Sequence, residues 1–151
     1  MRVFKAPEPL IQNQYSAVFL AGSIDMGTAQ DWQAEVCNHF SDTDKNIYNP
    51  RRDDWDNSWE QKIDNPQFNQ QVNWELSAME KADLIIMNFL PGSASPITLL
   101  ELGLHAGSKK LVVCCPDDYY RRGNVHIVCN NYNIPLFKNL DELLESIKNK
   151  S

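Results

Sequence analysis

Short apolar segments alternate along the chain with longer segments of helical periodicity, and this alternation limits the folds that the chain can adopt. The apolar segments, such as Ala17–Ala21 and Asp83–Leu90, show little polar alternation, which indicates strands covered on both faces. Between them, apolar residues recur every three or four positions, as in helices that pack on one face. This repeated alternation of strands and helices predicts an α/β fold with a mostly parallel sheet between two layers of helices.

Individual elements follow from the same patterns. A helix is expected to run from its N-cap Thr28 to Phe40, and another begins at Pro66, because proline is tolerated in the first turn of a helix. Arg121–Asn124 is interpreted as a solvated turn or a subunit contact, and Met1–Lys5 as a short extended segment. The other expected elements are strands at 17–21, 46–48, 83–90, 110–115 and 135–137, and helices at 97–106 and 140–148. All 151 residues are expected to form a single domain with a sizeable core.

The carboxyl ends of the expected strands mark the place where a ligand would bind. In parallel sheets, ligands bind beyond these ends, near the point where the strand order reverses. Residues 22–25, 49–55 and 91–98 each follow a strand, so they are expected around one crevice.

Glu75 is the first unusual residue near this crevice. Phe68, Val72, Leu76 and Met79 fall on one stripe of the expected helix, and Glu75 lies near the middle of that stripe. A buried carboxylate is costly unless it is paired or functional. Either the helix is rotated so that Glu75 reaches the rim or a basic partner, or Glu75 takes part in chemistry.

Glu101 is the second unusual residue. It lies in the segment Ile97–Ala106, whose apolar residues surround the helix and predict that the helix is buried on all sides. Glu101 is therefore expected to be shielded and to face the crevice; the alternative is a partly exposed side chain. Two carboxylates from distant segments suit glycosidic chemistry, in which one attacks or stabilises the anomeric carbon and the other protonates the leaving group. Burial would raise the pKa of one of them and keep it an acid near neutral pH.

The strand ends carry further candidate binding residues. Gly22 and Ser23 form a tight turn that is either structural or holds a sugar or phosphate oxygen. The hydroxyl-rich segment 92–98 precedes a helix N-terminus, which suits binding of an anion or a sugar hydroxyl, but it lacks the lysine of a P-loop. An aromatic side chain in the segment 49–55 either stacks on a base or covers loop surface. The candidates in these last two segments are Asn49, Arg51, Asp54, Trp55, Ser95 and Thr98.

Charge and cysteine content exclude several other classes of protein. A net charge of -6 argues against a nucleic-acid polymer as partner, since such binders present a basic face to phosphates. We expect a cytoplasmic protein without a membrane partner, because there is no membrane-length apolar segment and no secretory signal. Cys37, Cys114, Cys115 and Cys129 are expected to be reduced, and their spacing matches no zinc site. We expect no metal and no organic cofactor.

Four segments of the chain resemble the nucleoside 2-deoxyribosyltransferase family, especially its short deoxyribosyltransferase-like branch. They are residues 18–24, 49–52, 73–75 with 82–83, and 95–106. The resemblance implies a flavodoxin-like (Rossmann-like) three-layer α/β sandwich with a mostly parallel five-stranded sheet. It also implies that the partners are a small-molecule nucleoside or nucleotide and a free nucleobase, and that the protein is a homo-oligomer in which a neighbour often completes the site.

The resemblance further implies a mechanism. Glu101 would attack C1′ of a 2′-deoxynucleoside to form a covalent deoxyribosyl ester, and a second base would then displace Glu101 with retention of configuration. Glu75 matches the general acid of the family, where aspartate is common. Ser23 matches a residue that lines the sugar site in the related deoxynucleotide N-glycosidases.

Other positions depart from the family pattern and leave alternatives open. Phe19 stands where the family commonly has tyrosine, and Ser95 or Thr98 would have to replace an aspartate that binds the sugar. One alternative is a hydrolase of deoxynucleosides or their 5′-monophosphates, with Arg51 or Arg52 holding the phosphate. The other is a nucleotide-binding module without catalytic activity.

Overall fold

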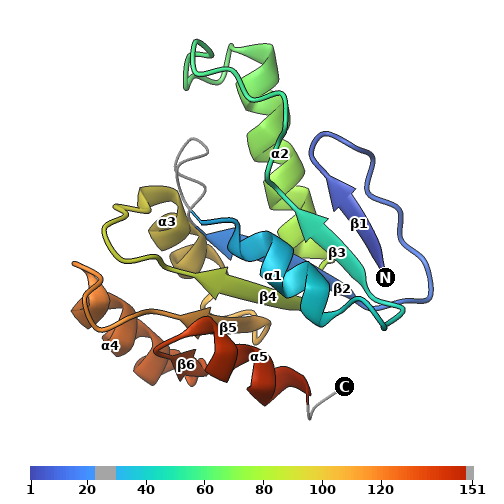
Figure 1. Ribbon diagram of the computed structural model, residues 1–151. Coiled ribbons are helices and arrows are strands. Elements are labelled where there is room, and N and C mark those ends of the chain that lie inside the picture. The colour runs from blue at the N-terminus through green and yellow to red at the C-terminus, as the bar shows by residue number, and fades with distance from the viewer. Residues whose placement is uncertain (23–29, 149–151) are drawn as a thin grey trace.

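Six parallel strands form one sheet in the computed structural model, which describes residues 1–22 and 30–148 (Figure 1). The strands lie in the order β1-β3-β2-β4-β5-β6, and every neighbouring pair is parallel. Their bounds are Arg2–Lys5 for β1, Ala17–Gly22 for β2, Asn46–Asn49 for β3, Leu84–Asn88 for β4, Leu111–Cys114 for β5 and Leu136–Phe137 for β6. Without β1, the order is that of a flavodoxin-like sheet, so the predicted fold class is confirmed.

The prediction of five strands is wrong by one, because β1 also belongs to the sheet. β1 pairs with β3 from Arg2 opposite Asn46 to Lys5 opposite Asn49. Both end residues of β1 are exposed and Phe4 is buried, as expected for a strand at the edge of a sheet. Such a short polar strand lacks the continuous apolar pattern by which the buried strands were predicted.

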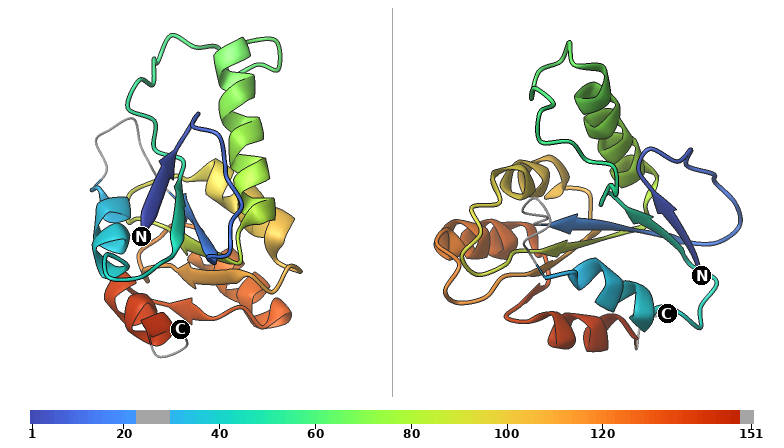
Figure 2. Two further views of the ribbon diagram at one scale, coloured as in Figure 1. Left: turned by 90° about the vertical axis from the view of Figure 1, so that its right-hand side faces the viewer. Right: turned by 45° about the horizontal axis from the view of Figure 1, so that its top comes forward.

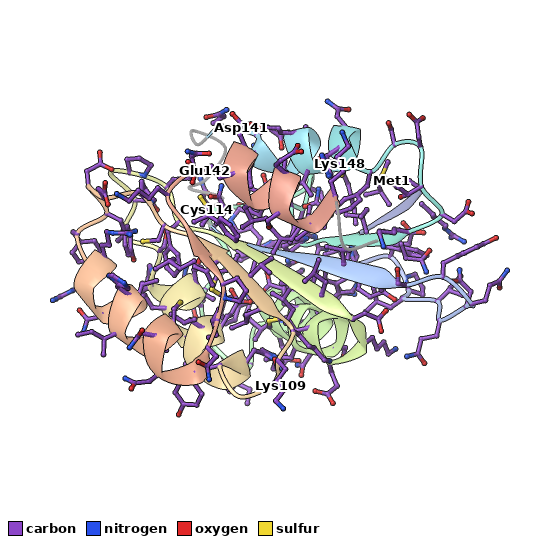
Figure 3. The ribbon with its side chains drawn as sticks, turned by 90° about the horizontal axis from the view of Figure 1, so that it is seen from below. Met1, Lys109, Cys114, Asp141, Glu142 and Lys148 are labelled. Carbon is purple, nitrogen blue, oxygen red and sulfur yellow. The ribbon has the colours of Figure 1, made fainter. Side chains whose placement is uncertain are left out.

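Helices cover both faces of the sheet, which confirms the predicted three layers (Figures 2 and 3). The helices are α1 at Trp32–His39, α2 at Pro66–Lys81, α3 at Pro96–His105, α4 at Arg122–Tyr132 and α5 at Leu140–Lys148. The buried apolar residues form two core clusters, one on each face of the sheet. The first cluster joins one face to α2, α3 and α4, and the second joins the other face to α1 and α5. Neighbouring residues of β2 alternate between them: Phe19 belongs to the first cluster, Val18 and Leu20 to the second.

Two helices differ from the sequence predictions. α4 was not predicted: a turn or a subunit contact was expected at Arg121–Asn124, and no element was assigned to residues 125–132. Its buried residues are Val125 and Cys129, too few to give an apolar pattern. α1 begins at Trp32, where the side chain of Asp31 accepts a hydrogen bond from the backbone of Ala34 at 3.1 Å. The predicted N-cap Thr28 lies outside the described residues.

The described ranges were also searched for membrane spans. Within residues 1–22 and 30–148, no helix is both long enough and apolar enough to cross a bilayer.

Candidate active site

Glu75 lies on the sheet-facing side of α2. The helix begins where the side chain of Asn65 accepts a hydrogen bond from the backbone of Phe68 at 2.9 Å, with Pro66 in the first turn. Its buried residues are Gln71, Trp74, Ala78 and Met79, and Glu75 lies on the same side. The predicted stripe is therefore rotated, because Leu76 is 43% exposed whereas the polar Gln71 is buried.

Glu101 lies on the buried side of α3, together with Thr98 and Leu102. The prediction that α3 is buried on all sides is wrong for the isolated chain. Three apolar residues of α3 are 56–60% exposed, namely Ile97, Leu100 and Leu104. The sheet covers one side of the helix, and nothing within the described chain covers these three side chains fully.

The two carboxyl groups lie close enough to interact electrostatically. Burial raises the pKa of Glu75 to about 7, and a hydrogen bond from Gln71 opposes this rise. Burial raises the pKa of Glu101 to about 8, and the nearby charge of Glu75 contributes to the rise. Since neighbouring carboxyl groups titrate as a pair, the two share one proton between about pH 7 and 8.

Gln71 connects Glu75 to the end of β3. Its Nε2 donates hydrogen bonds to the backbone oxygen of Pro50 at 2.9 Å and to Oε1 of Glu75 at 3.1 Å. Its own Oε1 is buried, and no group in the described part of the chain donates a hydrogen bond to it. Gln71 therefore orients Glu75 and places a free acceptor oxygen beside it.

Gly22 allows β2 and β4 to approach closely where β2 ends. A Cβ atom at this position would lie 2.4 Å from the backbone oxygen of Asn88 and 2.8 Å from the side chain of Trp32. Gly22 also has φ 153°, which L side chains rarely adopt. The structure thus accounts for glycine at this strand end. Ser23, predicted beside it, lies outside the described residues.

The loop before α3 holds the hydroxyl groups predicted at this edge. Ser95 is buried in a left-handed conformation with φ 47°, and its hydroxyl lies 2.8 Å from that of Ser93. The Tyr119 hydroxyl donates to the backbone oxygen of Ala94 at 2.8 Å and so fastens the loop to the segment after β5. Thr98 is buried on the same side of α3 as Glu101.

Asn49 and Arg51 lie where β3 ends. Asn49 is buried and accepts a hydrogen bond from the backbone of Arg51 at 3.0 Å, which forms a turn. The guanidinium of Arg51 lies 3.8 Å from Asp31, at the start of α1. Arg51 is thus held by this long ion pair and by a 3.4 Å hydrogen bond that it donates to Gln33.

The rest of this loop is fastened to α2. Arg52 binds Asp54 at 2.6 Å and Gln70 at 3.2 Å, and its guanidinium lies over the ring of Trp59. Its hydrogen bond lowers the pKa of the exposed Asp54. Trp55 packs edge-on against Trp59, with ring centroids 5.1 Å apart. The loop and the start of α2 project from the body of the molecule (Figure 1), and the contacts of Asp54 with Arg52 and of Trp55 with Trp59 lie within this loop.

Phe19 lies beneath the helices. It is fully buried in β2, within the core cluster that also contains Trp74 of α2 and Leu102 of α3. In this position it supports the helices that carry Glu75 and Glu101.

Sequence analysis missed two residues of this arrangement. Gln71 precedes Glu75 by four positions, and this spacing on a helix was the available signal. Tyr119 gave no such signal, because its bond to Ala94 joins segments that are distant in the chain. For metals, no group of three or more His, Cys, Asp or Glu side chains within residues 1–22 and 30–148 is arranged to hold an ion.

Comparisons with known proteins identify the family to which the chain belongs. A family model described as "Nucleoside 2-deoxyribosyltransferase like" matches residues 15–119. A comparison with curated proteins finds no match to the chain. The matched region includes β2 to β5 and both helices that carry the carboxyl pair, whereas β1, α4, β6 and α5 lie outside it.

Proposed function

Because the chain belongs to the nucleoside 2-deoxyribosyltransferase-like family, we propose that it transfers 2′-deoxyribosyl groups between nucleobases. The observation that carries this proposal is the pair of the half-buried Glu75 and the buried Glu101, whose charges interact. One carboxyl group can serve as nucleophile and the other as acid, the combination that retaining glycosidic chemistry requires. Family membership by itself indicates deoxyribosyltransferase-like nucleoside chemistry.

In the proposed reaction, the Glu101 carboxylate attacks C1′ as the bond from C1′ to the base nitrogen breaks. The electron pair of that bond goes to the base, which receives the proton of Glu75. The product is a deoxyribosyl ester of Glu101 and a free base. A second base then gives a proton to Glu75 and attacks C1′, which releases Glu101 and retains the configuration.

This reaction needs the shared proton on Glu75. Burial raises the pKa of both carboxyls, so without substrate the proton can reside on either of them, the nucleophile Glu101 included. A base nitrogen beside Glu75 and developing positive charge at C1′ beside Glu101 favour the proton on Glu75. The two distributions have the same total charge, so we propose that substrate binding moves the proton from Glu101 to Glu75.

The other candidate residues are assigned by their place around the pair. We propose that the backbone and hydroxyl groups at the ends of β2 and before α3 hold the sugar, and that the segment after β3 contacts the base or forms the rim. Phe19 supports the sugar site from below. The sugar contacts would be Gly22, Ser23, Ser95 and Thr98, and the base or rim contacts Asn49, Arg51, Asp54 and Trp55.

Glu101→Gln tests the proposal. The enzyme is incubated with one deoxynucleoside and a second free base, and formation of the new nucleoside is followed by chromatography. We expect base exchange by the wild type and a loss of about a thousandfold or more in Glu101→Gln, because the amide cannot attack C1′. Mass spectrometry of quenched wild type should find the sugar on Glu101.

The control is Glu145→Gln, which changes an exposed glutamate of α5 and should keep wild-type exchange. Glu101→Gln should also remain folded at pH 8. In the wild type, the raised pKa of Glu101 stabilises the fold as long as this carboxyl is protonated. That contribution to the free energy of unfolding is complete below the ordinary pKa of 4.5 and is lost as the pH rises through the folded-state pKa of about 8. Exchange by Glu101→Gln at the wild-type rate would contradict the proposed mechanism.

Hydrolysis is the second candidate, favoured by the position of Arg51. Its guanidinium has two long contacts, a 3.8 Å ion pair with Asp31 and a 3.4 Å hydrogen bond to Gln33, so it can turn to a 5′-phosphate. Arg52, in contrast, is bound to Asp54 at 2.6 Å and to Gln70. Hydrolysis predicts free deoxyribose or its phosphate whether or not a second base is present. Nucleoside binding without any turnover, unchanged in Glu101→Gln, would instead indicate a non-catalytic module.

We also propose that a second copy of the chain covers the exposed face of α3. Leu104 of α3 and the exposed Leu76 of α2 line the same surface depression, which is also lined by the polar residues Ser77, Glu80, Lys81 and His105. The apolar side chains therefore continue from one helix to the next, as at the centre of a subunit interface.

A further inference from the structure

The side-chain amide of Gln71 is only half satisfied. Gln71 is 5% exposed, and both hydrogens of its Nε2 are used, one for the Pro50 backbone oxygen and one for Glu75. Its Oε1 is shielded from solvent and accepts no hydrogen bond from the described residues. A buried acceptor without a donor costs about 1–3 kcal/mol, so its presence in a folded protein calls for an explanation.

The orientation of this amide follows from its partners. A backbone oxygen only accepts hydrogen bonds, so the nitrogen of Gln71, and not its oxygen, must face Pro50. The same nitrogen donates to Oε1 of Glu75, which favours Oε2 as the oxygen that carries the Glu75 proton. Gln71 Oε1 is bonded to the same amide carbon as Nε2, so it lies beside Glu75. The site thus presents a proton donor and a free acceptor next to each other.

We propose that Gln71 recognises the nucleobase, with its Oε1 accepting a hydrogen bond from an amino group beside the ring nitrogen that Glu75 protonates. This inference rests on the proposed function of Glu75. Adenine has such an edge, since its 6-amino group lies next to N7, and cytosine has one in its 4-amino group and N3. Hypoxanthine and uracil present an oxygen in place of the amino group, and this oxygen would face another acceptor. The substrate class is therefore nucleosides of amino-bearing bases.

Binding of free bases tests this inference without requiring turnover. Titration calorimetry measures the affinity of adenine against hypoxanthine, and of cytosine against uracil, for the wild type and for Gln71→Leu. We expect the wild type to bind the amino-bearing member at least about tenfold more tightly in one of the pairs. In Gln71→Leu that preference should fall to about threefold or less, because neither base then meets the amide oxygen.

Matched variants separate recognition from folding. Gln67→Leu makes the same substitution at an exposed position one turn earlier on α2 and should keep the wild-type preference. Gln71→Met, which has an unbranched side chain of similar length, replaces Gln71→Leu if circular dichroism shows that the latter is unfolded. A purely structural role of Gln71 would weaken both bases of a pair equally and leave their ratio unchanged.

The possible results have distinct meanings. Equal binding of both bases in each pair by the wild type, no binding of any base, or an undiminished preference in the Gln71 variant would overturn the inference. A preference that the Gln71 variant loses, in a protein that neither exchanges nor hydrolyses any nucleoside, would refute the proposed enzymatic function but support recognition by Gln71.

Discussion

At the scale of single residues, the proton shared by Glu75 and Glu101 should determine the pH dependence of the reaction. Their pKa values are raised to about 7 and about 8. Below this range both carboxyls are protonated and no nucleophile is present, and above it both are ionised and no acid remains. We therefore expect kcat/KM to be highest between about pH 7 and 8, measured by base exchange across a pH series.

Glu75→Gln should change the shape of this profile as well as its height. Removing the negative charge of Glu75 lowers the pKa of Glu101 from about 8, so activity on the acid side should follow the titration of this single carboxyl instead of the pair. The fall on the alkaline side should disappear, and the maximum should drop by about a hundredfold or more. Glu145→Gln, an exposed change on α5, is the control. A Glu75→Gln profile that keeps both limbs at their wild-type positions would contradict the assignment.

At the scale of elements, each carboxylate depends on a helix that is anchored to the loops around it. Gln71 joins α2 to the end of β3, and Tyr119 joins the loop before α3 to the segment after β5. These links hold the two helices in a common arrangement although α2 and α3 come from different parts of the chain. Precise placement of this kind is what nucleophilic and acid catalysis require of a scaffold.

Tyr119→Phe tests the second link. The substitution removes the hydroxyl bonded to Ala94 but keeps the ring, which packs on Phe89 with centroids 4.8 Å apart. We expect the free energy of unfolding to fall by about 1 kcal/mol, measured by chemical denaturation. If the loop holds the sugar, KM for a deoxynucleoside should rise severalfold while kcat changes less.

Tyr120→Phe is the matched control for this link. It removes a hydroxyl from the neighbouring tyrosine, which is 61% exposed, and should leave both stability and KM near their wild-type values. Equal effects of the two substitutions would show that the bond to Ala94 has no special role.

At the scale of the whole molecule, the exposed apolar face of α3 should control assembly. Light scattering coupled to size-exclusion chromatography should find an oligomer for the wild type and a shift toward monomer for Leu100→Glu, which places a charge on a residue that is 60% exposed in the isolated chain. Ile63→Glu, at an 85% exposed loop position, is the control and should remain oligomeric. A monomeric wild type would overturn the proposed interface.

Whether an element could be predicted from the sequence depends on how many of its residues are buried. β4 and the buried strands beside it were predictable because burial on both faces leaves continuous apolar segments. β1 and α4 were not, because an edge strand and a mostly exposed helix bury too few residues to produce a pattern. The rotation of α2 was also missed, since the buried Gln71 is polar while Leu76 is exposed.

The same division applies to the candidate site. A carboxylate within an apolar helical pattern can be recognised in the sequence, so Glu75 and Glu101 could be predicted as candidate catalytic residues. The alternation of strands and helices was sufficient to predict the α/β class. Periodicity depends only on near neighbours along the chain, and it cannot specify pairings between distant segments. Three-dimensional packing alone establishes the coupling of the two carboxyl groups, the free oxygen of Gln71 and the exposed side of α3, because burial and hydrogen bonding depend on which segments meet in space.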